Sequence, residues 1–117
     1  MIEGAHIDKK SHSNQIFEMV EYLNSFDQSI KIAHDKLIEQ NGVAIIVTAD
    51  HETGGLQFNN QTKEQISNSL YTRTGHSSKD VPYFIYFKPS KNVDLNALKP
   101  KIDNTDIFKL CKSFISK

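Results

Sequence analysis

Residues 43–55, VAIIVTADHETGG, decide the predicted fold because a strongly apolar run passes directly into a polar segment. The β-branched run 43–47 follows a predicted helix, a pattern typical of a strand buried on both faces of an α/β sheet. The polar segment 48–55 then lies at the C-terminal end of that strand, the edge where open α/β sheets bind ligands. We therefore expect a central strand with a functional site beside it.

Helices are predicted before and after this strand in the sequence. Apolar residues recur at helical spacing over 16–23 and over 30–38, which predicts two helices or one bent helix. Asn41-Gly42 ends the second pattern, because glycine tolerates the left-handed conformation that ends helices. Residues 104–106 can cap a last helix. Its predicted apolar face consists of Ile107, Phe108, Cys111, Phe114 and Ile115.

Short strands complete the predicted fold. Three are bounded by Asn, Gly, Ser or Pro: residues 56–58, 67–72 and 83–87. Residues 1–14 are polar with little periodicity, which predicts a loop or a strand end. Because domains typically have about 100 to 150 residues, and no linker or repeat is found, we expect residues 1–117 to form a single domain. The predicted class is α/β, a mixed β-sheet with flanking helices.

The composition argues against several kinds of partner. Fourteen basic and fourteen acidic side chains cancel, and no basic stripe interleaved with aromatic residues is found, so we expect no nucleic-acid binding. The longest apolar run, 43–47, is far shorter than the roughly 20 residues that cross a bilayer, so we expect no membrane span. The first residues lack the basic and apolar regions of an export signal. With Cys111 as the only cysteine, any metal would be bound by His, Asp and Glu.

The first candidate metal-binding segment is EGAHIDKKSH, residues 3–12. Glu3, Asp8 and His12 lie close enough in sequence to converge from one loop, and carboxylate and imidazole ligands suit zinc and magnesium. On spacing alone, a solvated loop with chance His and acidic residues explains the segment better than a metal site does. His6 has no partner in this pattern and is not expected to be a ligand.

The second candidate segment follows the predicted central strand. Asp50 and His51 end that strand, and the two glycines after them allow close approach of the backbone. A cap or turn made by Asp50 beside an exposed His51 explains the segment equally well. His76 precedes the strand at 83–87 and could project toward the same sheet edge, although a single loop histidine is usually just exposed. His34 lies on the apolar stripe of a helix and is expected to be structural.

In combination, these motifs resemble the C-terminal half of alkaline phosphatases. Glu-Gly-Ala-x-Ile-Asp-x-x-x-His is followed by Thr-Ala-Asp-His-Glu-Thr-Gly-Gly-Leu and then by Gly-His before Val-Pro. The segment DNTDIF at 103–108 also resembles that family. The resemblance runs from Met1 to about Ile115. Each motif alone is a weak signal, but three of them in this order are highly specific.

The resemblance implies a metal-dependent phosphate monoester hydrolase that uses two zinc ions and one magnesium ion. In that family the metals activate a serine, and zinc-bound hydroxide then hydrolyses the phosphoserine. Paired metals clamp the attacking and leaving oxygens and lower the pKa of bound water. The expected fold is the C-terminal part of the alkaline phosphatase-like α/β sandwich. A periplasmic or extracellular location is also expected from the resemblance.

The resemblance carries six residues onto the family's metal ligands: Glu3 for magnesium; Asp8, His12 and His76 for the first zinc; Asp50 and His51 for the second zinc. Lys9 matches a lysine that in some members lies near the magnesium or the phosphate, and a solvated side chain is the alternative. The family's serine nucleophile, phosphate-binding arginine and further metal ligands are expected upstream of this segment. Only the first zinc would therefore have all its protein ligands here, and the chain alone is expected to be inactive.

Two other interpretations remain open at this stage. A related phosphomutase or sulfatase shares Asp-His metal motifs, although the continuation ETGG at 52–55 argues against it. A non-catalytic metal-binding or self-associating module would explain why no serine lies in the family's Asp-Ser-Ala setting. Because the first part of the sandwich is expected to be missing, exposed apolar faces should make the chain form homo-oligomers or leave it only marginally stable.

Overall fold

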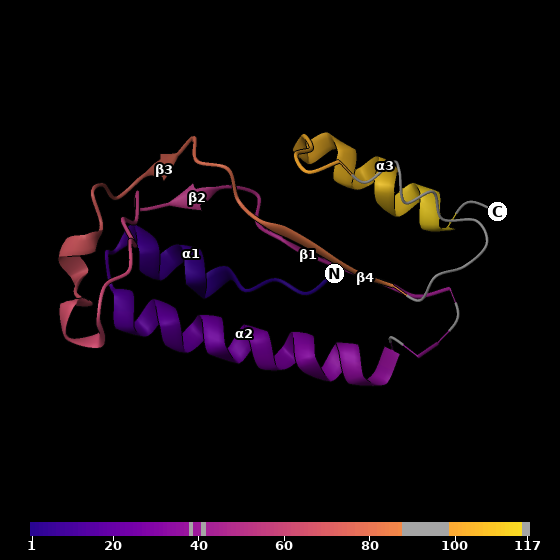
Figure 1. The fold of residues 1–117 in the computed structure, drawn as a ribbon, viewed down its shortest axis with the longest axis horizontal. Helices are drawn as coiled ribbons and strands as arrows, with labels where there is room; N and C mark the ends of the chain where they lie inside the picture. Colours follow the sequence, from indigo (N-terminus) through magenta and orange to yellow (C-terminus); the bar gives the residue numbers. More distant parts are fainter. Residues whose placement is uncertain (38, 41, 88–98, 116–117) are drawn as a thin grey trace. The chain divides into compact units, whose positions relative to one another are not determined.

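The computed structural model describes residues 1–37, 39–40, 42–87 and 99–115 (Figure 1). The elements follow in the order α1 (Ala5–His12), α2 (Ile16–Leu37), β1 (Ala44–Thr48), β2 (Glu52–Thr53), η1 (Lys63–Gln65), η2 (Asn68–Leu70), β3 (His76–Ser77), β4 (Tyr83–Phe87) and α3 (Asn104–Ile115), where η marks a 3-10 turn. The chain divides into two compact units: unit 1 is Met1–Lys31 with Ala49–Pro82, and unit 2 is Ile32–Thr48 with Tyr83–Lys117. Helices combined with small sheets agree with the predicted α/β class.

The core of unit 1 is built on the start of α2. Ile16, Met19 and Tyr71 are buried. Partly buried apolar residues pack against them: Ile7, Leu56, Ile66 and Leu70. Because Ile7 belongs to α1 and Leu56 follows β2, this core holds together the elements that carry the candidate site.

Helix α1 corrects the prediction of a loop or strand end over residues 1–14. The helix is short, and Ile7 is its only large apolar residue, so the sequence carried no helical periodicity. Tertiary contacts stabilise it instead, as is usual for short helices. Ile7 packs on the core, and Ser11 is buried with its hydroxyl donating a 2.8 Å hydrogen bond to the Ile7 carbonyl. The helical patterns predicted at 16–23 and 30–38 correspond to the single helix α2, which is described up to Leu37, while Ile38 and the predicted stop at Asn41 lie outside the described residues.

The predicted strands at 56–58 and 67–72 are wrong. Residues 56–58 have no regular structure, and the second segment contains the 3-10 turn η2. The two segments meet in a backbone hydrogen bond of 2.9 Å from Gln57 N–H to the Leu70 carbonyl. Asn68 turns its side-chain oxygen to Ile16 N–H at 2.9 Å, which satisfies a donor at the open end of α2. This side-chain bond favours a turn over a strand.

Unit 2 contains the strand that the sequence analysis placed at the centre of a sheet. β1 pairs antiparallel with β4, from Ala44 opposite Phe87 to Thr48 opposite Tyr83. The strand assignment is confirmed, but its predicted burial on both faces is wrong, because the side chains of β1 are only partly buried or exposed. Within the described residues, both sheets are two-stranded and antiparallel rather than one mixed sheet.

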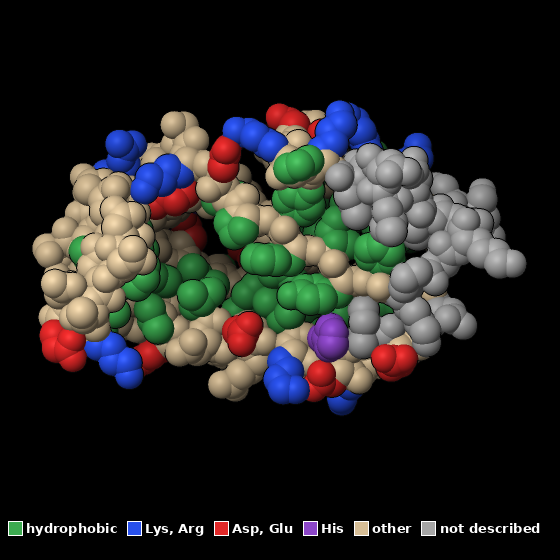
Figure 2. Space-filling model, in the orientation of Figure 1, with side chains coloured by type: hydrophobic (Ala, Val, Ile, Leu, Met, Phe, Trp, Pro, Cys, Tyr) green, Lys and Arg blue, Asp and Glu red, His purple; other side chains and the backbone are tan. Residues whose placement is uncertain are grey.

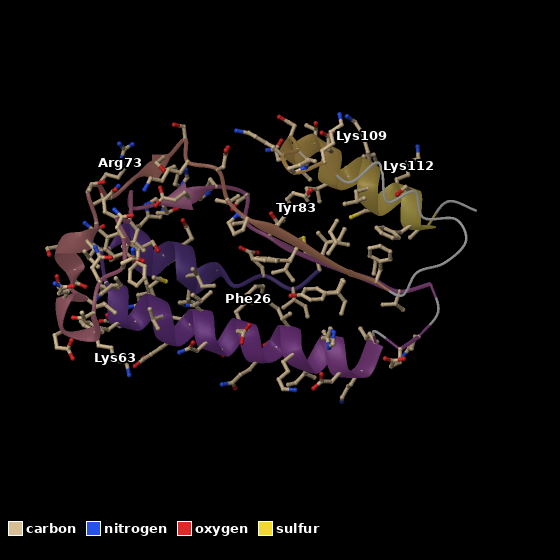
Figure 3. The ribbon with its side chains drawn as sticks, viewed as in Figure 1. Phe26, Lys63, Arg73, Tyr83, Lys109 and Lys112 are labelled. Carbon is tan, nitrogen blue, oxygen red and sulfur yellow. The ribbon has the colours of Figure 1, made fainter. Side chains whose placement is uncertain are left out.

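Helix α3 is confirmed as the last helix. Asp103 caps it, accepting from Thr105 N–H at 2.9 Å, while Asp106 accepts from Asp103 N–H at 3.2 Å. The capping residue therefore lies one position before the predicted 104–106. The predicted apolar face is only partly correct: Ile107 and Phe114 are half-buried, whereas Phe108, Cys111 and Ile115 are exposed. Lys109 and Lys112, labelled in Figure 3, are also exposed.

Apolar side chains reach the surface in unit 2. Figure 2 shows hydrophobic side chains gathered around the β1–β4 pair, and Phe84 and Tyr86 of β4 are 53% and 40% exposed. No helix in the described ranges has both the length and the apolar character of a membrane span.

Candidate metal centre

Helix α1 presents the first two residues of the candidate site. Asp8 and His12 are one helical turn apart, so their side chains lie on the same face. The Oδ1 atom of Asp8 is 3.4 Å from Nε2 of His12. Both side chains are accessible, at 39% exposure for His12 and 42% for Asp8. A loop was predicted here, but the helix fixes the spacing of the two ligand atoms more firmly than a loop would.

The sheet of unit 1 presents two further histidines. β2 and β3 pair antiparallel, with Glu52 opposite Ser77 and Thr53 opposite His76. His51 immediately precedes β2, and its ring stacks on that of His76, with the ring centres 3.6 Å apart. The predicted convergence of His51 and His76 on one place is therefore present, although at a two-stranded ladder of distant segments rather than on the edge of a large sheet.

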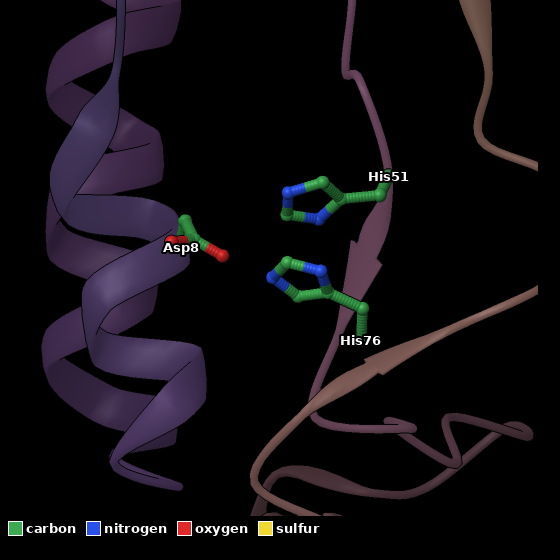
Figure 4. Close-up of side chains that lie close together, drawn as sticks. All are labelled: Asp8, His51 and His76. Atoms are coloured by element: carbon green, nitrogen blue, oxygen red, sulfur yellow. The ribbon is translucent and has the colours of Figure 1, made fainter.

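The helix and the sheet bring these side chains together. Asp8, His51 and His76 offer ligand atoms that all lie within 4.8 Å of one another. Figure 4 shows the Asp8 carboxylate pointing from α1 toward the two imidazole rings. His12 joins them, since its Nε2 is 3.2 Å from Nε2 of His76. We call these four residues, Asp8, His12, His51 and His76, the Asp-His cluster.

The distances in the Asp-His cluster fit a zinc ion. Two atoms bound at about 2.0 to 2.1 Å to one tetrahedral zinc lie about 3.3 to 3.4 Å apart. The Asp8–His12 and His12–His76 distances are 3.4 and 3.2 Å, close to that value. Imidazole nitrogen and carboxylate oxygen are also the ligand types that zinc takes when cysteine is absent. Asp8, His12 and His76 could thus hold one zinc with a position left open.

Hydrogen bonds outside the Asp-His cluster fix the tautomers of its histidines. His12 Nδ1 lies 2.5 Å from the carbonyl oxygen of Thr74. Since a carbonyl can only accept, Nδ1 carries a proton, and in the neutral ring the lone pair of Nε2 is directed at the cluster. The buried Thr53 hydroxyl donates to Asp8 Oδ1 at 2.6 Å and lies 3.1 Å from His51 Nδ1. A hydroxyl that donates to Asp8 can only accept from His51, so Nδ1 of His51 carries a proton, and in the neutral ring Nε2 is left to bind a metal.

The remaining predicted site residues lie around or apart from the Asp-His cluster. Asp50 is 86% exposed, and its Oδ2 is 3.4 Å from His51 Nε2. Lys9 is exposed on α1. Glu3 lines an open pocket of about 190 Å³ with residues of α2 that include Tyr22 and Phe26; Phe26 is labelled in Figure 3. No cluster residue lines that pocket, so the structure groups Asp50 with the cluster but not Glu3.

Two groups were missed by the sequence analysis. Thr53 contacts both Asp8 and His51, and its position two residues after His51 in an extended segment is a signal that could have been used, because alternate residues of a strand share a face. The carbonyl of Thr74 acts through the backbone, so no residue type at that position could have revealed it. The division of the ligands between two zinc ions and a magnesium ion stays a prediction.

Comparison with known proteins identifies the family of the chain. The family model described as "Alkaline phosphatase" matches residues 1–108. "Alkaline phosphatase" of Schizosaccharomyces pombe is 35% identical over 75 residues, which cover 61% of this chain and 13% of that protein. "Alkaline phosphatase 3" of Bacillus subtilis is 36% identical over 55 residues, covering 47% of this chain and 12% of that protein. The chain therefore spans only a small part of these relatives. No solved structure gives a significant match.

Proposed function

The chain belongs to the alkaline phosphatase family, and from this premise we propose that it forms the metal-binding C-terminal part of a phosphate monoester hydrolase. One observation carries the proposal: His12 Nε2 lies 3.4 Å from Asp8 Oδ1 and 3.2 Å from His76 Nε2, separations that suit one tetrahedral zinc, and ligand atoms of Asp8 and His76 lie within 4.8 Å of each other. Family membership alone supports a phosphatase at the level of the whole protein. The convergence connects that activity to residues of this chain.

The first zinc is assigned to Asp8, His12 and His76. Three protein ligands leave a fourth position open for water or a phosphate oxygen, as catalytic zinc sites require. When bound there, zinc would lower the pKa of a coordinated water and polarise a phosphate oxygen. The chain's own contribution is orientation: the Thr74 carbonyl keeps His12 Nε2 available, and the Thr53 hydroxyl holds the Asp8 carboxylate.

A second zinc is assigned to Asp50 and His51. The stacking of His51 on His76 supports this assignment, because it keeps the second pair of ligands beside the first. From the sequence, this assignment is supported by the resemblance of the ADHETGG motif to that of alkaline phosphatases. The assignment of Glu3 to magnesium and of Lys9 to the phosphate surroundings rests on the resemblance alone.

Zinc retention tests the proposal. The chain, dialysed against zinc and then against buffer, should retain the metal, and the double variant His12→Ala/His76→Ala should lose it because two of three ligands to the first zinc are gone. The matched control is His6→Ala/His34→Ala, which removes two exposed or half-exposed imidazoles that contact Tyr22 and Tyr86 instead. Metal content is measured by elemental analysis. Equal retention by both double variants would refute the assignment.

A further inference from the structure

Glu52 lies in β2, directly after His51, on the face of the β2–β3 ladder opposite to Thr53 and His76. It pairs with Ser77 across the β2–β3 ladder, while its neighbour Thr53 pairs with His76. Successive side chains in a strand point to opposite faces. Since Thr53 and His76 face the Asp-His cluster, Glu52 and Ser77 face away from it. Glu52 is therefore not placed as a ligand, but it can affect the positions of the residues that face the Asp-His cluster.

The Glu52 carboxylate accepts hydrogen bonds from β3 and from the segment that follows β2. Ser77 Oγ donates to its Oε2 atom. The backbone N–H of Gly55 donates to the same oxygen at 3.3 Å, and that of Leu56 donates to Oε1 at 3.0 Å. Lys79 adds a positive charge nearby, and its Nζ donates to the Leu56 carbonyl at 3.0 Å. We call this set of contacts the Glu52 clamp.

The Glu52 clamp joins three parts of the chain through one carboxylate. Its two oxygens accept from the Ser77 hydroxyl of β3 and from the backbone N–H groups of Gly55 and Leu56, which follow β2. Charge-assisted hydrogen bonds of this kind are stronger than neutral ones. The contacts therefore constrain the chain more firmly than a ladder of two residue pairs would.

The clamped segment also supports the loop that leads to His76. Gly54 and Gly55 have φ values of 91° and 60°, a backbone conformation that residues other than glycine rarely adopt. The Gly54 carbonyl accepts from the N–H groups of Thr72 and Arg73, and Gly54 N–H donates to the Gly75 carbonyl at 3.0 Å. The loop from Thr72 to Gly75 includes the Thr74 carbonyl that contacts His12. Fixing the glycine turn thus fixes the approach to two histidines of the cluster.

We propose that Glu52 is a positioning residue: its carboxylate joins β2, β3 and the glycine turn and thereby sets His51 and His76 at the spacing that binds metal. The proposal deepens the proposed function and rests on it, because the spacing matters only if these histidines are ligands. Removing such supporting groups typically costs roughly 10- to 100-fold in metal affinity. Glu52→Gln keeps the size of the side chain but removes the charge, so a loss in this range is expected.

Two readouts on the whole 117-residue chain test the clamp. Zinc affinity is measured by competition with a chromophoric chelator, and the ring proton shifts of His51 and His76 are measured by NMR without metal. Glu52→Gln should weaken zinc binding by roughly tenfold or more and should reduce the mutual ring-current shifts that come from stacking. Glu64→Gln, at an exposed glutamate of η1, is the matched control and should change neither.

Ser77→Ala is a second, milder variant, needed in case Glu52→Gln does not fold. It removes the hydrogen bond from Ser77 to Glu52 and keeps the charge of the carboxylate. It should shift zinc affinity in the same direction by a smaller factor, and Glu52→Gln/Ser77→Ala should lose less than the two single losses combined. Unchanged zinc affinity and unchanged ring shifts in both single variants would overturn the clamp. If the wild-type chain binds no zinc, the proposed function is overturned instead. The ring proton shifts of His51 and His76, compared between wild type and Glu52→Gln, would still test whether the Glu52 clamp positions these histidines.

Discussion

The hydroxyl of Thr53 connects the helix and the sheet that form the Asp-His cluster. It is buried, donates to Asp8 at 2.6 Å and lies 3.1 Å from His51 Nδ1. Asp8 comes from α1 and His51 from the residue before β2, so a single oxygen atom aligns ligands from two elements. Metal ligands in proteins generally depend on such partners for orientation and tautomer.

Thr53→Val removes this hydroxyl at nearly constant shape. We expect zinc affinity to fall by roughly 10-fold or more, because Asp8 loses its donor and either tautomer of His51 becomes available. Thr74→Val is the matched control, since Thr74 contacts His12 through its backbone carbonyl, which valine keeps. Zinc competition titrations and the long-range ¹⁵N couplings of the His51 ring measure the two effects. A Thr53→Val chain with wild-type affinity and an unchanged tautomer would show that the hydroxyl is dispensable.

At the residue scale, sequence predicted which side chains would meet better than how they would meet. Residue type and spacing alone favoured a solvated loop for Asp8 and His12 and an exposed loop residue for His76, and only the family resemblance made them ligands together with His51. All four side chains lie in one cluster, and their role as ligands stays a prediction. Their geometry could not be predicted, because it depends on the packing of a helix that the local sequence does not signal. Backbone groups such as the Thr74 carbonyl are invisible to residue type altogether.

At the scale of elements, side-chain hydrogen bonds at the N-terminus of α3 determine where that helix begins. The carboxylate of Asp103 accepts from both the N–H and the hydroxyl of Thr105, and Asp106 returns a bond to Asp103 N–H. This reciprocal arrangement is a capping box with acidic residues. The carboxylates also lie at the end of α3 where negative charge is favoured by the helix dipole.

The cap of α3 should fail in acid. Hydrogen bonds from the Thr105 backbone and side chain lower the pKa of Asp103, and the hydrogen bond from Lys109 with that from Asp103 N–H lowers the pKa of Asp106. A lowered pKa means that the ionised groups stabilise the helix above their unfolded pKa, near 4. That stabilisation is lost as pH falls through the lowered folded values. The protection of the α3 amides, that is, their exchange rate relative to the unstructured chain at the same pH, should therefore be steady at neutral pH and fall only below about pH 4.

A substitution isolates this effect. Asp103→Ala should lower the protection of the amides in the first turn of α3 at neutral pH and should remove most of the further loss of protection in acid. Asp27→Ala, at an exposed position in the interior of α2, is the control and should leave α3 unchanged. Exchange rates in α3 that do not respond to Asp103→Ala would show that the cap contributes nothing to the helix.

Elements with strong periodicity were predicted from sequence, and elements that depend on tertiary contacts were not. β1, β4, α2 and α3 carry long apolar patterns, and each was found close to its predicted bounds. α1 and η2 are polar, and contacts far along the chain stabilise them: Ile7 packs on the core near Tyr71, and Asn68 bonds to Ile16. The β2–β3 ladder has only two residue pairs, too few for an alternating pattern to mark it.

At the scale of the whole molecule, the chain has little core for its length. Among the described residues, the buried hydrophobic side chains are Ile16, Met19 and Tyr71, all in unit 1. In unit 2, exposed aromatic side chains on β4 accompany a sheet of two strands. A small core supports only marginal stability, and exposed apolar faces favour association. Self-association of the chain stays a prediction that light scattering can decide.

The last prediction concerns activity. The zinc-loaded chain should not turn over a chromogenic phosphate monoester at alkaline pH at a rate near that of an alkaline phosphatase. Metal ligands and nucleophile act as a unit in covalent phosphate transfer, so losing the nucleophile removes the covalent route however well zinc binds. No serine in this sequence lies in an Asp-Ser-Ala setting.

Residual hydrolysis by zinc-bound hydroxide should be slow and should leave no phosphate on the protein, which mass spectrometry after quenching in acid would detect. The double variant His12→Ala/His76→Ala separates this background from contamination, because it removes two ligands of the first zinc and should abolish the residual rate. His6→Ala/His34→Ala should keep it. Rapid zinc-dependent turnover with a phosphorylated intermediate would contradict the prediction, and mapping the phosphorylated residue would then identify a nucleophile within residues 1–117 that no motif in this sequence marks.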